Sequence, residues 1–121
     1  MIEADIIAHL EADAGVGAIA DDRIYPEPLP QNPVLPAISY RRISGERDYT
    51  LSGPSGLAKV RLQFDCWATL FLTARNLADA VVAALHALPD SDTRITTDLD
   101  AFDPEAEVQR VVVDAEILYQ V

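Results

Sequence analysis

Apolar side chains recur with helical spacing near the start of the chain. Residues 1–13 carry an apolar side chain at every fourth position, with acidic residues on the other faces, which predicts an amphipathic helix. The apolar positions are Ile2, Ile6 and Leu10. We expect Gly15 and Gly17 to end this helix, and residues 16–20 to add one short turn.

A second and longer helical stripe covers residues 72–88 and lies among many alanines. Its apolar positions are Leu77, Val81, Leu85 and Leu88. Thr73 is the candidate N-cap, and Pro89 is expected to end the helix. The alanines permit close approach to a sheet.

Alternation with a period of two predicts four strands, at residues 37–44, 58–70, 94–100 and 107–120. The inward positions of the second strand are Val60, Leu62, Phe64, Cys66 and Ala68, and those of the last are Val111, Val113, Ala115, Ile117 and Tyr119. In the third strand Ile95, Thr97 and Leu99 share a face. The first strand has Ile38 and Tyr40 on one face and loses phase at Arg41 and Arg42, which permits a bulge.

Two connections have unusual composition. Residues 25–36 hold five of the eight prolines, so we expect an extended surface connector without ladder pairing. Residues 45–57 contain Ser-Gly-Pro-Ser-Gly at 52–56 and are expected to form a long mobile loop. The whole chain, 1–121, is predicted to be one α+β domain, a mostly antiparallel sheet of about four strands packed against the N-terminal helix and the alanine-rich helix.

The charge distribution adds a polarity to this picture. The net charge is −11, which argues against an ordinary nucleic-acid binder. Residues 41–61, however, hold five basic groups against Glu46 and Asp48, a local balance of +3, whereas the rest of the chain carries −14. A dipolar subunit suits head-to-tail association with its own copies or docking on an oppositely charged partner. A solvated hairpin with scattered arginines explains the pattern equally well.

Candidate chemistry is sparse. Cys66 lies within an apolar strand pattern, which predicts that it is a small buried apolar residue. His9 and His86 fall within the predicted helices, where we expect them to have structural rather than catalytic roles. The acidic run at residues 98–107 lacks the spacing of a calcium-binding loop, so we predict a solvated loop between two strands. We therefore expect no catalytic residue, no cofactor and no metal, and a chain made in the cytoplasm without a signal peptide or membrane span.

The order of short motifs resembles the tail-terminator, or tail-completion, family of long-tailed phages and gene transfer agents. A short helix precedes Asp-Arg-Ile-Tyr-Pro at 22–26, and Leu-Pro-Ala-Ile-Ser-Tyr follows at 35–40. A Gln-x-Asp-x-Trp-Ala strand at 63–68 then leads into the alanine-rich helix. The resemblance spans most of the chain in the same order.

The resemblance implies a structural virion protein that is not an enzyme. Such proteins form a ring, typically a hexamer, at the head–tail junction. The ring caps the tail tube, stops its polymerisation and offers a surface for the head connector, while DNA passes through the lumen. The implied partners are copies of the chain itself, the tail-tube protein and a connector or stopper protein. The candidate interface residues are Arg41, Arg42, Arg47, Tyr49, Lys59, Arg61 and Trp67.

Three other functions remain open from the sequence. A head-completion or connector protein also forms rings of small α+β domains. A ligand-binding module outside any virion predicts a concave apolar pocket with a few polar groups. A metal-dependent hydrolase or nuclease would need carboxylates clustered around Asp65 or in residues 98–103.

Overall fold

The computed structural model of the protein describes residues 2–104 and 107–120. Three helices and five strands follow one another along the chain. They are α1 (Ile2–Ala12), α2 (Ala14–Ala20), β1 (Ile24–Pro26), β2 (Ala37–Thr50), β3 (Gly53–Ala68), α3 (Phe71–His86), β4 (Ser91–Asp103) and β5 (Val108–Gln120). The predicted α+β class is confirmed, with five strands in the sheet rather than four.

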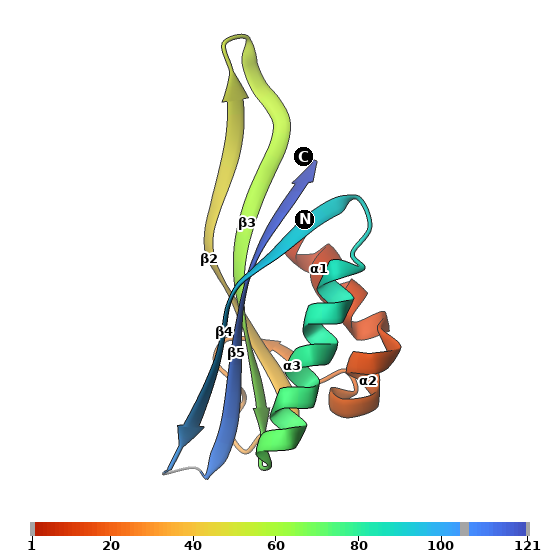
Figure 1. The fold of residues 1–121 in the computed structure, drawn as a ribbon, viewed down its shortest axis with the longest axis vertical. Coiled ribbons are helices and arrows are strands. Elements are labelled where there is room, and N and C mark those ends of the chain that lie inside the picture. The colour runs from red at the N-terminus through yellow and green to blue at the C-terminus, as the bar shows by residue number, and fades with distance from the viewer. Residues whose placement is uncertain (1, 105–106, 121) are drawn as a thin grey trace.

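The five strands form one sheet in the order β1-β2-β3-β5-β4. The pairs β2–β3, β3–β5 and β5–β4 are antiparallel, and only the short β1 pairs in parallel, with β2. The sheet is strongly twisted, and the β2–β3 hairpin extends well beyond the other strands (Figure 1). The sheet is therefore mostly antiparallel, with β1 and β4 as its outermost strands.

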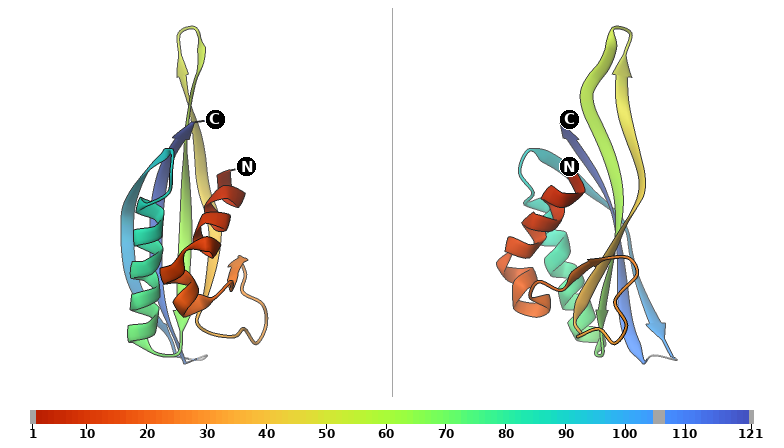
Figure 2. Two further views of the ribbon diagram at one scale, coloured as in Figure 1. Left: turned by 90° about the vertical axis from the view of Figure 1, so that its right-hand side faces the viewer. Right: turned by 180° about the vertical axis from the view of Figure 1, so that it is seen from behind.

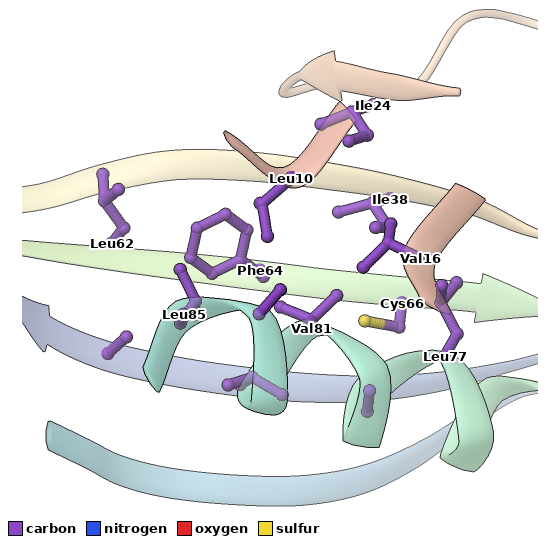
Figure 3. Packing of buried hydrophobic residues seen from close by; sticks show 14 of the residues in the cluster. Leu10, Val16, Ile24, Ile38, Leu62, Phe64, Cys66, Leu77, Val81 and Leu85 are labelled. Carbon is purple, nitrogen blue, oxygen red and sulfur yellow. The ribbon is translucent and has the colours of Figure 1, made fainter. Parts of the chain in front are cut away.

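All three helices cover the same face of the sheet (Figure 2). The core lies between that face and the helices, where Phe64 is surrounded by Leu10 of α1 and by Val81 and Leu85 of α3 (Figure 3). The predicted inward positions of β3 are all buried, and so are those of β5 except the half-buried Tyr119. Alternation identified these two strands because one of their faces packs on the helices and the other does not.

The ends of the helices differ from the sequence prediction. The helix predicted at 1–13 is observed from Ile2, the first described residue, to Ala12. It ends there because Asp13 adopts an extended conformation (φ −73°, ψ 127°). The Asp13 carboxylate accepts a hydrogen bond from Val16 N at 3.0 Å and so caps α2, which contains both glycines that we expected to stop α1. The third helix has Leu70 in place of Thr73 at its N-cap, with no side-chain capping bond.

The predicted loop at residues 45–57 is wrong in its secondary structure. β2 continues to Thr50 and β3 begins at Gly53, so most of this segment is paired in an antiparallel ladder. Two register shifts interrupt the ladder, one between Arg42 and Ser44 and one between Arg47 and Tyr49. The first is the bulge that the loss of phase permitted.

Two further segments were assigned wrongly in part, although residues 27–36 of the proline-rich connector form no helix or strand, as expected. The start of the proline-rich connector belongs to β1, where Tyr25 and Pro26 pair with Ser39 and Tyr40 of β2. The acidic run at 98–107 is not a loop in its first half, because β4 continues to Asp103. Residues 105 and 106 of that run lie outside the described residues. A register shift between Ile95 and Thr97 also separates Ile95, which packs on the core, from Leu99, which is 56% exposed.

Candidate assembly surface

The projecting part of the β2–β3 hairpin is the most exposed region of the described chain. Every β2 residue from Arg41 to Thr50 whose side chain is described is exposed. Near the tip, Tyr49 is 65% exposed and Leu51 fully exposed, while Ile43 and Leu57 are each 37% exposed. A tip that holds apolar side chains in solvent gains nothing in the isolated subunit, which points to a contact with another molecule.

The pleat and the first bulge divide the seven candidate interface residues between the two faces of the sheet. Four of them lie on the face away from the helices. Lys59, Arg61 and Trp67 alternate along β3 with its buried residues, and Arg41 pairs with Gln63 on the same outward face. Arg42 and Arg47 pair with the inward-facing Leu62 and Ala58 and so lie on the helix side, and Tyr49 follows after the second bulge. The seven residues therefore form no single patch.

The helix-free face carries a layer of paired charges. Arg61 Nη2 donates to Asp114 Oδ2 at 3.0 Å on the neighbouring β5, and Lys59 Nζ lies 3.6 Å from Glu46. Arg41 Nε lies 3.5 Å from Glu27. Within the described residues, Arg61 Nε and Asp114 Oδ1 are buried without a hydrogen-bond partner. The basic groups of this face are thus largely compensated inside the subunit.

Trp67 is held in place by polar and cationic contacts on the same face. Its indole Nε1 donates to Ser39 Oγ at 2.9 Å, and the Arg110 guanidinium lies 5.2 Å from the ring centroid. Arg110 also lies 3.6 Å from Asp65, which is only 2% exposed and accepts a hydrogen bond from Gln63. The Asp65 carboxylate is thus paired beside the aromatic ring of Trp67. A small hollow of about 260 Å³ adjoins Trp67 and Arg110.

On the helix side, an open groove of about 870 Å³ is lined by α1, by β2, by the turn between α3 and β4 and by the end of β5. Arg42 Nη1 spans it to donate to Glu3 Oε1 of α1 at 2.7 Å. Arg47 and Tyr49 line the groove, and Arg47 makes no ion pair with any described residue. The groove is bordered by several charged side chains, unlike the apolar pocket that a small-ligand module would show.

An arginine that the sequence analysis did not single out organises the acidic strand. Arg75 of α3 donates to both carboxylate oxygens of Asp98, at 2.8 and 2.7 Å, and to Asp100 at 3.2 Å. Asp79, one helical turn away, is 3.4 Å from the same guanidinium. The Asp98 hydrogen bond raises the pKa of Arg75 despite its partial burial. These carboxylates are thus bound to a cation of the protein itself, which explains their clustering without calcium.

Cys66 is buried in the core, and His9 connects two helices. Burial raises the pKa of the Cys66 thiol far above its usual range, so the thiol stays protonated at neutral pH. His9 Nε2 lies 2.7 Å from the carbonyl oxygen of Ala84 and joins α1 to α3. Within residues 2–104 and 107–120, no three His, Cys, Asp or Glu side chains gather as metal ligands. In the same ranges, no helix has the length and apolar content to cross a membrane.

Sequence reasoning missed Arg75, Arg110 and Asp114 because each lies on an element other than that of its partner. The sequence offered one signal for the Arg75 contact: an arginine near the start of the alanine-rich helix, and an acidic strand directly after that helix. Such a signal gives no register between the helix and the strand. The contacts became visible only when the sheet order placed β4 beside β5 under α3.

Comparison with known proteins places this fold in a family. No curated protein matches the sequence. Among solved structures, a chain from the virion of a native gene transfer agent (GTA) particle has the same fold, with a TM-score of 0.73 and 18% sequence identity over 99% of this chain and 95% of that chain. The family model described as "Tail completion protein gp17" matches residues 4–120. Because that match spans nearly the whole chain, the protein belongs to the tail completion protein gp17 family.

Proposed function

We propose that this protein is a tail terminator, a ring-forming subunit that caps the head-proximal end of a tail tube. The observation that carries the proposal is the family match over residues 4–120. In this role the ring stops polymerisation of the tube and offers a surface to the head connector. The subunit is then a structural virion component at the head–tail junction and acts without catalysis.

The shape of the subunit supports a ring. A closed ring needs heterologous contacts, in which one patch of a subunit meets a different patch of the next. The two sides of the sheet, along β2 and along β4, differ and can supply such a pair. The ends of the long axis, which are the hairpin tip and the exposed apolar side chains around the start of α3 (Figure 1), are then free to contact the tube and the connector. The apolar side chains around the start of α3 are Leu70, Phe71 and Leu72, which are 67%, 44% and 71% exposed. Contacts that bury these side chains would stabilise an assembly and are absent from a monomer.

The charge of the subunit supports passage of DNA through the ring. Protein binding to DNA is driven by Lys and Arg contacts to phosphates and the release of counterions. The net charge of −11 and the internal pairing of Arg61, Lys59 and Arg41 leave few free cations for that purpose. A lumen lined by such a subunit would let DNA slide.

Electron microscopy of particles from a strain that lacks this protein tests the proposal. A terminator predicts tails of uncontrolled length that carry no heads, and restoration of normal tails by the gene supplied in trans. Normal tails that remain unattached to heads would instead favour the connector alternative, because a connector acts after the tube has stopped growing. Normal particles would refute both virion roles.

The candidate interface residues can be tested in the same system. We propose that Tyr49, Arg47 and Arg42, on the helix side, and Arg41, Lys59, Arg61 and Trp67, on the opposite face, contact neighbouring subunits or the tube. Arg47→Ala is the sharpest single change, because Arg47 has no ion pair within the described residues and its loss leaves the fold intact. Glu11→Ala removes an exposed charge from α1, outside the proposed contacts, and is the control.

A further inference from the structure

The sheet has two long open edges. On β1's side, pairing with β2 ends at Tyr40, so residues 41–50 of β2 have β3 on one side and no described strand on the other. At the opposite side, β4 pairs only with β5 along its 13 residues. Open edges present rows of unpaired N–H and C=O groups, and native proteins usually shorten or cover them. Strands in globular proteins are usually about 3–10 residues long, so these edges are long as well as open.

The two edges run in opposite directions. Each step from β2 to β3, from β3 to β5 and from β5 to β4 is antiparallel, so three reversals separate β2 from β4. A second copy related by rotation about an axis along the strands keeps the same strand directions. Its β4 would therefore lie antiparallel to the first copy's β2, which is the more stable ladder.

The charges of the two edges are opposite in sign. Residues 41–50 carry three arginines against Glu46 and Asp48, whereas β4 carries four aspartates against Arg94. Arg41, Arg42, Asp98 and Asp100 are paired inside the subunit, which leaves Arg47 on β2 and Asp92 on β4 without an ion pair among the described residues. Neither edge contains a proline, which would remove a ladder donor. Opposite potentials favour contact between unlike edges over contact between like edges, so β2 would select β4 rather than a second β2.

From these observations we infer that β2 residues 41–50 of one copy add as a strand to the β4 edge of the next copy. The occupant of each edge is thus a second copy of this chain, and the sheet continues from subunit to subunit around the ring. The inference rests on the proposed ring and names the contact that closes it. Main-chain hydrogen bonds supply the affinity in this mode of contact, and the edge charges supply the choice of partner.

Paired cysteines test this contact directly. In a continued sheet, side chains that face each other across the new ladder lie on the same face. Ser44 lies on the helix-free face, as do Asp92, Arg94, Thr97 and Leu99 of β4. We would combine Ser44→Cys with a cysteine at each of these four positions and oxidise both the purified full-length chain and the assembled particles. The buried Cys66 leaves the background silent.

At least one of the four combinations should give a ladder of disulfide-linked oligomers on non-reducing gels, because directly opposed positions meet the Cα distance that a disulfide requires. Each single variant should stay monomeric on the gel, and a mixture of two single variants should stop at dimers. Ser44→Cys combined with Thr93→Cys is the matched control, since Thr93 lies on the helix side and pairs with the buried Ile117.

Two outcomes would overturn the inference. One is the absence of a ladder from all four combinations in assembled particles, and the other is a dimer formed by Ser44→Cys alone, which would place two β2 edges together. Either outcome is compatible with a terminator defect in the deletion strain. The edge contact can therefore fail while the proposed function stands. Conversely, normal tails in the deletion strain would refute the function without affecting the gel result for the purified chain.

Discussion

Replacement of Arg75 by methionine should destabilise the protein by removing the link between α3 and β4. The side chain of Arg75 is 26% exposed and those of Asp98 and Asp100 are 39% and 49% exposed. At such exposure, we take about 1 kcal/mol for the bidentate Asp98 contact and about 0.5 kcal/mol each for Asp100 and Asp79. The expected loss is therefore about 2 kcal/mol.

The magnitude can be converted into a melting temperature. With an unfolding entropy of about 2.1 cal/mol/K per residue, a chain of 121 residues should lose about 8 °C for a loss of 2 kcal/mol. Methionine keeps an unbranched apolar stem of similar length, so the measured change reports the lost ion pairs. Because the pairs are partly exposed, the difference between wild type and variant should shrink as salt is added.

The assay is urea denaturation followed by circular dichroism, supported by a thermal scan. Arg94→Met is the matched control, because Arg94 lies exposed on β4 and makes no ion pair with any described residue. We expect it to change the free energy of unfolding by less than about 0.5 kcal/mol. The reasoning fails if Arg75→Met destabilises the protein no more than Arg94→Met, or if its effect does not depend on salt.

Three further predictions concern other parts of the molecule. Phe64→Ala should cost about 3–5 kcal/mol in urea denaturation, because Phe64 is fully buried at the centre of the core, and a loss below that of the exposed Leu118→Ala would contradict this packing. Cys66 should resist a thiol reagent at pH 8 until the chain is unfolded, because burial raises its pKa and keeps it protonated; rapid labelling of the native protein would show that the strand is open. Tyr49→Ser combined with Leu51→Ser should leave the stability within about 0.5 kcal/mol yet reduce the amount of protein in purified particles, and normal incorporation would exclude the hairpin tip from assembly.

The sequence by itself determined the elements that bury one face. Apolar residues recur at every second position from Val60 to Ala68 and from Val111 to Ile117, where Val112 is an additional apolar residue, and Leu77, Val81 and Leu85 follow the helical period. These periods record which side of an element is withdrawn from water, so they survive in the sequence without knowledge of the partner. The order of these elements was also enough for the α+β class and for the family resemblance.

Only the tertiary structure decided the hairpin and the distribution of its charges. Residues 45–57 bury neither face against a core, so no alternation marks them as strands, and their pairing depends on β2 and β3 lying side by side. The bulge after Arg42 places Ser44 on the face opposite to Arg42, although residues two positions apart in a regular strand share a face. The Arg75 contact joins residues 23 and 25 positions apart. Such contacts depend on distances between separate elements, and those distances are set by the packing of the whole chain.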